Sequence, residues 1–187
     1  TDHYPMPTRL LFIRHARSVW NEAGRWQGQA DPPLSETGLA EARRLAARLQ
    51  RWNGIEHVYA SDLQRARLTT TVVAAALGAP LSIAPVWRGA TRNHGPMHVP
   101  GGETPEDVQR RVERACADLL PRHSDQTVAI VSHGGMILAT LVHLLGLGPL
   151  AFGRLVGGYH TAISQVDISD GHARLERLNA HAHLELL

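Results

Sequence analysis

Short apolar runs alternate along this chain with longer segments whose apolar residues recur at helical spacing. Residues 9–13 read Arg-Leu-Leu-Phe-Ile, and residues 128–131 read Val-Ala-Ile-Val. Continuous apolar runs of this kind are typical of strands that are covered on both faces. Strands that alternate with helices favour a parallel sheet between two layers of helices. The pattern therefore predicts an α/β fold, a three-layer sandwich whose mostly parallel central sheet has helices on both faces.

The predicted elements follow one another along the whole chain, and we expect residues 1–187 to form a single domain. Ser35 and Thr104 are expected to cap two of the helices, with Asp107 completing a capping box at the second. Asp170-Gly171 is a turn sequence typical of a hairpin. Strands are predicted at 9–13, 57–60, 81–86 and 128–131, a terminal hairpin at 162–168 and 173–178, helices at 36–52, 63–77, 104–120 and 136–145, and loops at 24–33 and 89–102.

The composition fits a globular protein with a core of its own. Of the 187 residues, 43% are hydrophobic and 19% are charged, and the formal net charge is +2. The chain has neither a dense basic run nor an apolar run of about 20 residues, so neither nucleic acid nor a membrane is expected as a partner. The first eight residues lack the apolar core of a signal peptide, which predicts a cytoplasmic protein.

All 19 basic residues are arginine, and lysine is absent. An anion site in this chain must therefore be built from Arg, His and backbone N–H groups. Cys116 falls in a helical pattern and is expected to be a buried apolar residue and not a catalytic thiol. The 12 histidines, among them His94, His98, His181 and His183, show no spacing typical of metal ligands, so no metal or other cofactor is expected.

Polar residues follow three of the predicted strands at the point where each strand ends. The first strand ends in Arg14-His15, the strand at 128–131 is followed by His133 and Gly134, and the strand at 57–60 is followed within a few residues by Arg65. Ligands of open α/β sheets bind beyond the carboxyl ends of the strands. A neutral imidazole there can attack phosphorus, and arginines can grip phosphate oxygens. Gly134 opens a helix, whose N-terminal N–H groups favour an anion.

These residues and their neighbours resemble the histidine phosphatase superfamily, also called the phosphoglycerate-mutase-like family. The family signature is Arg-His-Gly-(Glu/Gln)-(Ser/Thr)-x-x-Asn, and residues 14–21 read Arg-His-Ala-Arg-Ser-Val-Trp-Asn. Further blocks of the family occur in the same order along nearly the whole chain: Gly-Arg-Trp-Gln-Gly at 24–28, Asp-Pro-Pro-Leu-Ser-Glu-Thr-Gly at 31–38, Ser-Asp-Leu-Gln-Arg-Ala at 61–66, Pro-Gly-Gly-Glu-Thr at 100–104 and Val-Ser-His-Gly-Gly at 131–135.

The resemblance implies a role for each matching residue. His15 would accept the phosphoryl group, and Arg14, Arg65 and His133 would hold its oxygens. Asn21 would contact the phosphate or the substrate, and Ser18 would line the pocket. In this family the arginines and histidines take the place of the cation that metallophosphatases use, so the resemblance also implies no metal.

The chain departs from the family pattern at several positions. Ala16 replaces the usual Gly, and Arg17 replaces Glu or Gln and is expected to add positive charge at the mouth of the site. Gly89 stands where the family has the glutamate that protonates the leaving oxygen. Residues 89–100 are also much shorter than the family's usual helical insertion, so we expect an open site. Glu103 is the candidate substitute for the missing proton donor, and His94 and His98 lie in the same segment.

The sequence thus predicts an enzyme, a phosphoric monoester hydrolase of the histidine acid phosphatase kind that works through a phosphohistidine. A small phosphorylated metabolite is the expected substrate. A phosphohistidine-protein phosphatase is an alternative, because imidazole leaves without much help from an acid. A phosphate-binding or regulatory domain with little turnover is another alternative. A mutase is less favoured, because it must keep its intermediate away from water. The sequence is compatible with a homodimer.

Overall fold

The computed structural model describes residues 6–52, 54–89, 102–148, 151–152, 154–155 and 157–185. Their strands form one sheet of six in the order β3-β2-β4-β1-β5-β6. The first four strands of that order run parallel, whereas β5 is antiparallel to both β1 and β6. The predicted α/β architecture is confirmed. The strands are β1 (Thr8–Arg14), β2 (Ile55–Ala60), β3 (Leu81–Ile83), β4 (Thr127–Ser132), β5 (Ile163–Ser169) and β6 (His172–Ala180).

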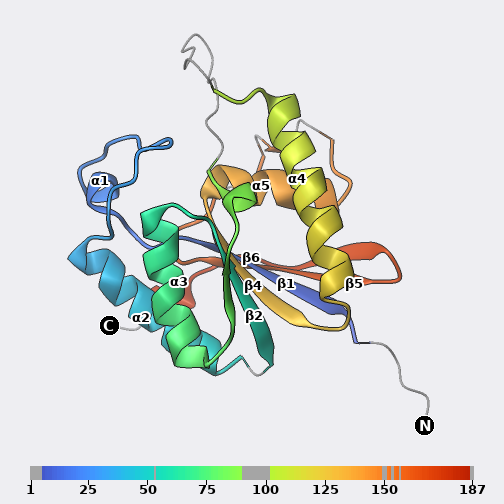
Figure 1. Ribbon diagram of the computed structural model, residues 1–187, viewed down its shortest axis with the longest axis horizontal. Helices are drawn as coiled ribbons and strands as arrows, with labels where there is room; N and C mark the ends of the chain where they lie inside the picture. Colours follow the sequence, from blue (N-terminus) through green and yellow to red (C-terminus); the bar gives the residue numbers. More distant parts are fainter. Residues whose placement is uncertain are drawn as a thin grey trace.

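Helices cover both faces of the sheet, as Figure 1 shows. The helices α2 (Glu36–Gln50) and α3 (Gln64–Leu77) pack together on one face, and α4 (Pro105–Leu119) and α5 (Gly134–Leu144) pack together on the other. Alternate residues of β1 serve the two cores: Leu10 and Phe12 join the core under α4 and α5, whereas Leu11 and Ile13 join the core under α2 and α3. The apolar run of β1 is therefore explained by burial on both faces.

The predicted helix caps are confirmed. Ser35 accepts a hydrogen bond from the backbone N–H of Gly38 at the start of α2. Thr104 and Asp107 form the reciprocal capping box of α4. Cys116 is buried in the core, and burial raises the pKa of its thiol to about 12. The terminal hairpin also forms, with Asp170 and Gly171 in the left-handed conformation that its turn requires.

Several boundaries differ from the predictions by one to three residues, and two of these differences have a local cause. The strand predicted at 81–86 stops at Ile83, and a 3₁₀ turn, η1 (Pro85–Trp87), follows it. Pro85 has no N–H to give to a sheet and favours the first position of a helical turn. Trp87 is then buried, with its ring centroid 6.2 Å from that of Phe12. The fifth helix begins at Gly134 and not at residue 136, because the glycines that follow the strand are already helical.

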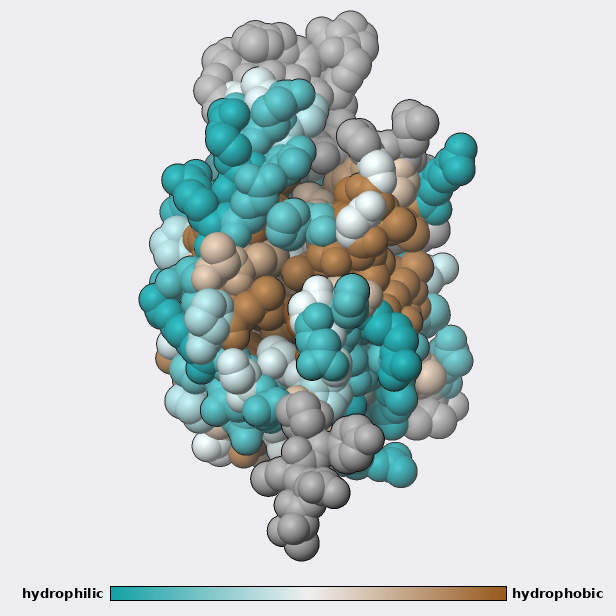
Figure 2. All heavy atoms as spheres, turned by 90° about the vertical axis from the view of Figure 1, so that its right-hand side faces the viewer, coloured by the Kyte–Doolittle hydropathy of each residue, from teal (hydrophilic) through white to brown (hydrophobic). Residues whose placement is uncertain are grey.

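An apolar band crosses one face of the molecule between hydrophilic regions (Figure 2). On the α4–α5 side of the sheet, Leu144, Ile168 and Leu175 are partly buried against the core. None of the helices in the described part of the chain is both long and apolar enough to cross a bilayer.

Candidate active site

The four residues predicted to hold a phosphoryl group lie together at the carboxyl ends of the parallel strands. Arg14 ends β1, and His133 caps α5 directly after β4. The backbone N–H of His15 donates to the carbonyl of Ser132 at 2.9 Å, which ties the two strand ends together. The ring centroids of His15 and His133 are 4.9 Å apart, and the charge of Arg65 acts on both rings. The fold therefore assembles in space what lay 118 residues apart in sequence, counted from His15 to His133.

His15 is fixed in the form that a nucleophile requires. Its Nδ1 lies 2.8 Å from the carbonyl oxygen of Ala16. A carbonyl only accepts hydrogen bonds, so Nδ1 carries the hydrogen and the lone pair is left on Nε2. Burial, His133 and Arg65 together hold the pKa of His15 well below 6.5. The ring is therefore neutral at physiological pH, with Nε2 able to attack.

His133 is held by a buried serine. Its Nε2 lies 2.9 Å from the hydroxyl oxygen of Ser61, and this hydroxyl also accepts from the N–H of Leu63. Burial, followed by the charges of Arg65 and Arg14, lowers the pKa of His133 well below 6.5. Ser61 was not among the predicted site residues. Its position directly after β2, at the same sheet edge, is the sequence feature that points to it.

The guanidinium groups of Arg14 and Arg65 donate hydrogen bonds to backbone carbonyls, and each has a further N–H donor without a partner in the part of the chain that the structure describes. Arg14 donates from Nη1 to the carbonyl of Gly158 at 2.7 Å. Arg65 donates to the carbonyls of Ala30 at 2.8 Å and Gly28 at 3.1 Å. The Nε atom of each guanidinium is buried and has no hydrogen-bond partner within the described residues. Burial lowers the pKa of Arg65 to about 10, so the group remains a cation at neutral pH. Buried, unpaired cationic donors beside a neutral imidazole form a site suited to an anion.

Comparison with known proteins decides the family. The family model described as "Histidine phosphatase superfamily (branch 1)" matches residues 10–89 and 84–181. The chain belongs to this superfamily. It is 29% identical over 202 residues to phosphoserine phosphatase 1 of Hydrogenobacter thermophilus, covering 94% of each protein. It is 30% identical over 171 residues to the Enterobacter sp. protein named "Probable phosphoglycerate mutase GpmB", covering 79% of each.

Solved structures of the superfamily have the same fold. A mycobacterial glucosyl-3-phosphoglycerate phosphatase, in complex with VO3, superposes with a TM-score of 0.82 at 26% identity, over 93% of this chain and all of that one. YhfR of Bacillus stearothermophilus superposes with a TM-score of 0.85 at 24% identity, over 95% of this chain and 99% of that one. At 24% identity, the similarity to YhfR is evidence for the fold only.

Ala16 stands where the family signature usually has Gly, and the structure accommodates its methyl group. Its backbone has no left-handed conformation that would demand glycine, and its methyl group packs with Leu34 and Ala42 in a small apolar cluster. Its N–H donates to the hydroxyl of Thr69 at 3.0 Å. The methyl group therefore fills space in the wall behind His15.

Arg17 was expected to add positive charge at the mouth of the site. Its charge contributes to lowering the pKa of His160, and it is also paired with a carboxylate. Its guanidinium lies 3.1 Å from the buried carboxylate of Glu41, which also accepts from the Arg17 N–H at 2.9 Å. The Arg17 segment is packed so tightly that a Cβ on Gly38 would lie 1.9 Å from the Arg17 carbonyl oxygen. This close approach explains the glycine that ends the family block at residues 31–38.

Ser18 and Asn21 are placed beside the site but bond mainly to each other. They form the capping box of a short helix that was not predicted, α1 (Val19–Glu22). The Ser18 hydroxyl, fully buried, also lies 2.7 Å from Oε1 of Gln27. The Asn21 side-chain oxygen accepts from the Ser18 N–H at 3.1 Å. Their observed role is to shape the turn after His15, and substrate contact by either residue stays a prediction.

Gly134 allows a neighbouring segment to close over the start of α5. A Cβ at this position would lie 2.7 Å from the carbonyl oxygen of Gly157 and 3.8 Å from the side chain of Arg14. Only glycine permits this approach. The segment at 157–162 thereby reaches the site, and the backbone N–H of Thr161 donates to the carbonyl of Arg14 at 2.9 Å there.

The side of the site where the superfamily carries its acid glutamate is different. A Cβ on Gly89 would lie 3.1 Å from the ring of His133, so the position faces the site but supplies no carboxylate. Glu103 forms a two-pronged ion pair with Arg111, with both N–O distances 2.7 Å. Arg111 also donates to the carbonyls of Val86 and Arg88. The carboxylate of Glu103 is thus engaged by a cation that is itself held in place. His94 and His98 lie outside the described residues.

His160 is a histidine of the site that the sequence did not reveal. Its ring centroid is 5.4 Å from that of His15, and its Nδ1 lies 3.0 Å from the His15 carbonyl oxygen. It precedes β5, which runs antiparallel to β1 and begins where β1 ends. The start of an antiparallel strand therefore lies at the same sheet edge as the ends of the parallel strands. This topological rule would have pointed to His160.

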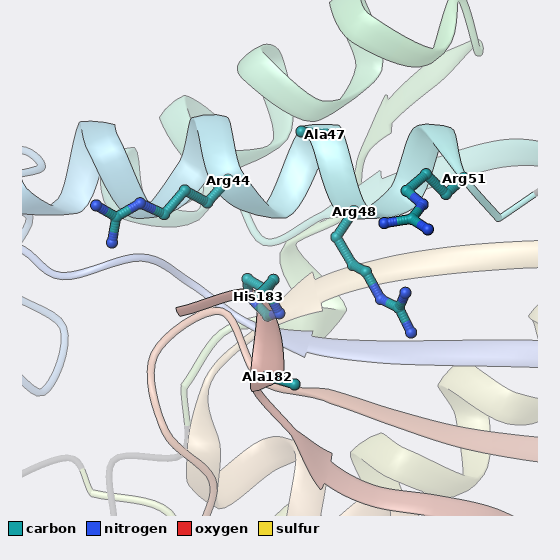
Figure 3. A pocket seen from close by; sticks show the side chains of 6 residues that line it. All are labelled: Arg44, Ala47, Arg48, Arg51, Ala182 and His183. Carbon is teal, nitrogen blue, oxygen red and sulfur yellow. The ribbon is translucent and has the colours of Figure 1, made fainter. Parts of the chain in front are cut away.

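A separate pocket lies between α2 and the short C-terminal helix η4 (Ala182–Leu184), with a volume of about 330 Å³. Figure 3 shows it beside the arginines of α2. His183 is buried there, and its Nε2 lies 3.0 Å from the hydroxyl of Thr161. None of the residues around His15 lines this pocket. The lining residues are Arg44, Ala47, Arg48, Arg51, Ala182 and His183.

Proposed function

We propose that this protein is a phosphatase that hydrolyses a phosphomonoester through a phosphohistidine on His15. The observation that carries the proposal is the neutral, buried His15 with its Nε2 lone pair, placed beside buried Arg65 and half-buried Arg14, whose Nε atoms are buried and have no partner among the described residues. The names of the relatives support the reaction class, since phosphoserine and glucosyl-3-phosphoglycerate phosphatases are among them. The whole chain would act as one catalytic domain.

In the first step, Nε2 of His15 attacks phosphorus and the bond from phosphorus to the substrate oxygen breaks. Arg14 and Arg65 grip the phosphoryl oxygens, and His133 donates a further hydrogen bond. The N–H groups at Gly134, at the start of α5, favour the same negative charge. In the second step, water attacks phosphorus, the P–N bond breaks and inorganic phosphate leaves. Dividing one displacement into two is the purpose of the covalent intermediate.

The proposed substrate is a small phosphorylated metabolite, as the names of the relatives suggest for the class. A second candidate is a phosphohistidine-protein phosphatase, and Gly89 is the observation that favours it. No carboxylate faces His133 at this position, and an imidazole leaving group needs less protonation than an alkoxide. Other similar proteins are named as probable phosphoglycerate mutases, so mutase activity is the competing reaction. We nevertheless favour hydrolysis, because the side of the site beside Gly89 lacks the family's acid.

The test is turnover of para-nitrophenyl phosphate, whose leaving group needs no acid. We expect the wild-type protein to turn it over and to form an acid-labile, base-stable phosphoprotein. His15→Ala should abolish both, with a loss on the order of 10⁴-fold or more in kcat. Equal inactivity of wild type and variant would leave only a phosphate-binding domain. A phosphohistidine peptide compared with phosphoserine separates the two enzyme candidates.

A further inference from the structure

A third histidine stands beside the nucleophile. His160 donates from Nδ1 to the backbone carbonyl of His15 at 3.0 Å, because a carbonyl accepts only. This bond fixes the tautomer and leaves Nε2 as the atom that can take up or release a proton. Nε2 has no hydrogen-bond partner among the residues that the structure describes. His160 is half-buried, whereas His15 and His133 are buried, so its ring lies toward the open side of the cluster.

The carboxylates around the site are already engaged by cations or amides. Glu41 pairs with Arg17, Glu103 pairs with Arg111, and Asp62 pairs with Arg88 at 2.5 Å. Asp31 accepts the N–H of Gln64. A carboxylate whose oxygens already accept hydrogen bonds from an arginine or a backbone N–H is held in place and is not free to turn toward a leaving group. Besides His15 and His133, which the proposed function uses as nucleophile and phosphate ligand, His160 is the titratable group described near His15 that retains a ring nitrogen without a partner.

We propose that His160 is the acid–base residue of this site and takes over the role that Gly89 leaves vacant. The inference rests on the proposed phosphatase function. In the first step the His160 imidazolium gives its Nε2 proton to the substrate oxygen as the P–O bond breaks and the bond to His15 forms. In the second step neutral His160 takes a proton from the attacking water as the P–N bond breaks. The residue returns to its imidazolium form, and the net reaction consumes one water.

The surroundings of His160 suit both forms. Burial and the nearby charge of Arg14 lower the pKa of His160 to about 4, so the ring is neutral in the free protein. A dianionic phosphate bound at Arg14 offsets that positive charge and favours the imidazolium. The proton that is needed at the leaving group is thus stabilised when substrate is present.

The experiment compares His160→Asn with the wild type on two substrates, phosphoserine and para-nitrophenyl phosphate. The asparagine amide can still donate to the His15 carbonyl, but it cannot transfer a proton. We expect kcat with phosphoserine to fall by about 10²-fold or more. With para-nitrophenyl phosphate we expect a rapid burst of nitrophenol at the wild-type rate, then slow turnover and accumulation of phosphorylated protein. His172→Asn, on exposed β6, is the matched control and should change neither.

The outcomes separate this inference from the function on which it rests. If the wild type forms a phosphoprotein and His160→Asn turns over phosphoserine equally well, His160 is not the acid–base residue. The inference would also be overturned if, in His160→Asn, the nitrophenol burst were slowed as much as phosphoserine turnover. That result would indicate that the substitution misplaces His15. Wild-type turnover of para-nitrophenyl phosphate without turnover of phosphoserine or other alkyl phosphates overturns it as well. Absence of any wild-type turnover or phosphoprotein overturns the phosphatase function itself.

Discussion

The floor of the site and the rim that faces the leaving group are built in different ways. On the floor, His15, His133 and Arg65 are all less than a tenth exposed, and their positions follow from strand ends that bond to each other. At the rim, Asp62 pairs with Arg88 and Glu103 pairs with Arg111, and Gly89 replaces the acid. The floor is arranged to hold an anion with few alternatives. We infer that the floor governs binding of an anion, whereas the rim governs what is done with the leaving group.

Among the changes that test this comparison, the largest effect is expected from removing a charge on the floor. Arg65→Ala should lower kcat for para-nitrophenyl phosphate by on the order of 10²–10³-fold, because a buried donor to the transferring phosphoryl group is lost. Arg88→Ala, at the rim, removes a side chain that is 46% exposed and paired with Asp62, and should change kcat little. Steady-state kinetics on both variants measures the difference, with circular dichroism as the control for folding. Equal losses would remove the distinction between floor and rim.

Restoring the missing carboxylate should sharpen the comparison. Gly89→Glu places an acid beside the ring of His133, where a Cβ has to fit at 3.1 Å after a small shift. We expect kcat for phosphoserine to rise about tenfold relative to that for para-nitrophenyl phosphate, since only the alkyl leaving group needs a proton. Gly89→Gln has the same shape without the proton and should give no rise. A rise with glutamine would show that shape and not acidity matters there.

The pH dependence of kcat/KM should show that the rings of His15 and His133 in the floor are neutral. Because the pKa values of His15 and His133 are lowered well below 6.5, protonation should not switch off the nucleophile at mildly acidic pH. We expect kcat/KM for para-nitrophenyl phosphate to show no descending limb as pH falls through 6.5, the ordinary value for histidine. Corrected for ionisation of the substrate, the profile measures the free enzyme. A loss centred on 6.5 would contradict the assignment.

The smallest effect concerns stability. The pKa values of His160 and His183 are lowered to about 4 in the fold, so below 6.5 the unfolded chain binds protons that the folded chain does not. This contribution to stability is present above pH 6.5 and is lost as pH falls toward 4. Tm should therefore drop on acidification, and His183→Gln should reduce that drop by on the order of a few degrees. Calorimetry between neutral pH and pH 4 checks it, and an unchanged drop would count against His183.

The sequence predicted the main strands and helices, the class of fold and the four residues Arg14, His15, Arg65 and His133 that lie together at one sheet edge. These followed from local patterns: apolar runs for strands, helical spacing with caps, and motifs placed directly after strands. Arg14 and His15 are adjacent in the chain, and the blocks containing Arg65 and His133 were recognisable in order. Information that lies within a few residues of a strand end is local, and the sequence carries it.

Tertiary structure alone decided which partners the side chains meet. Arg17 pairs with Glu41 because the turn after β1 lies against α2, and Arg111 of α4 is oriented by the carbonyls of Val86 and Arg88 as well as by Glu103. His160 reached the site because β5 joins β1 in the antiparallel direction, so its amino end meets the carboxyl end of β1. A strand's direction in the sheet is set by the long-range pairing of residues far apart in the chain. For that reason the sequence predicted which residues form the floor of the site, and only the fold showed the third histidine.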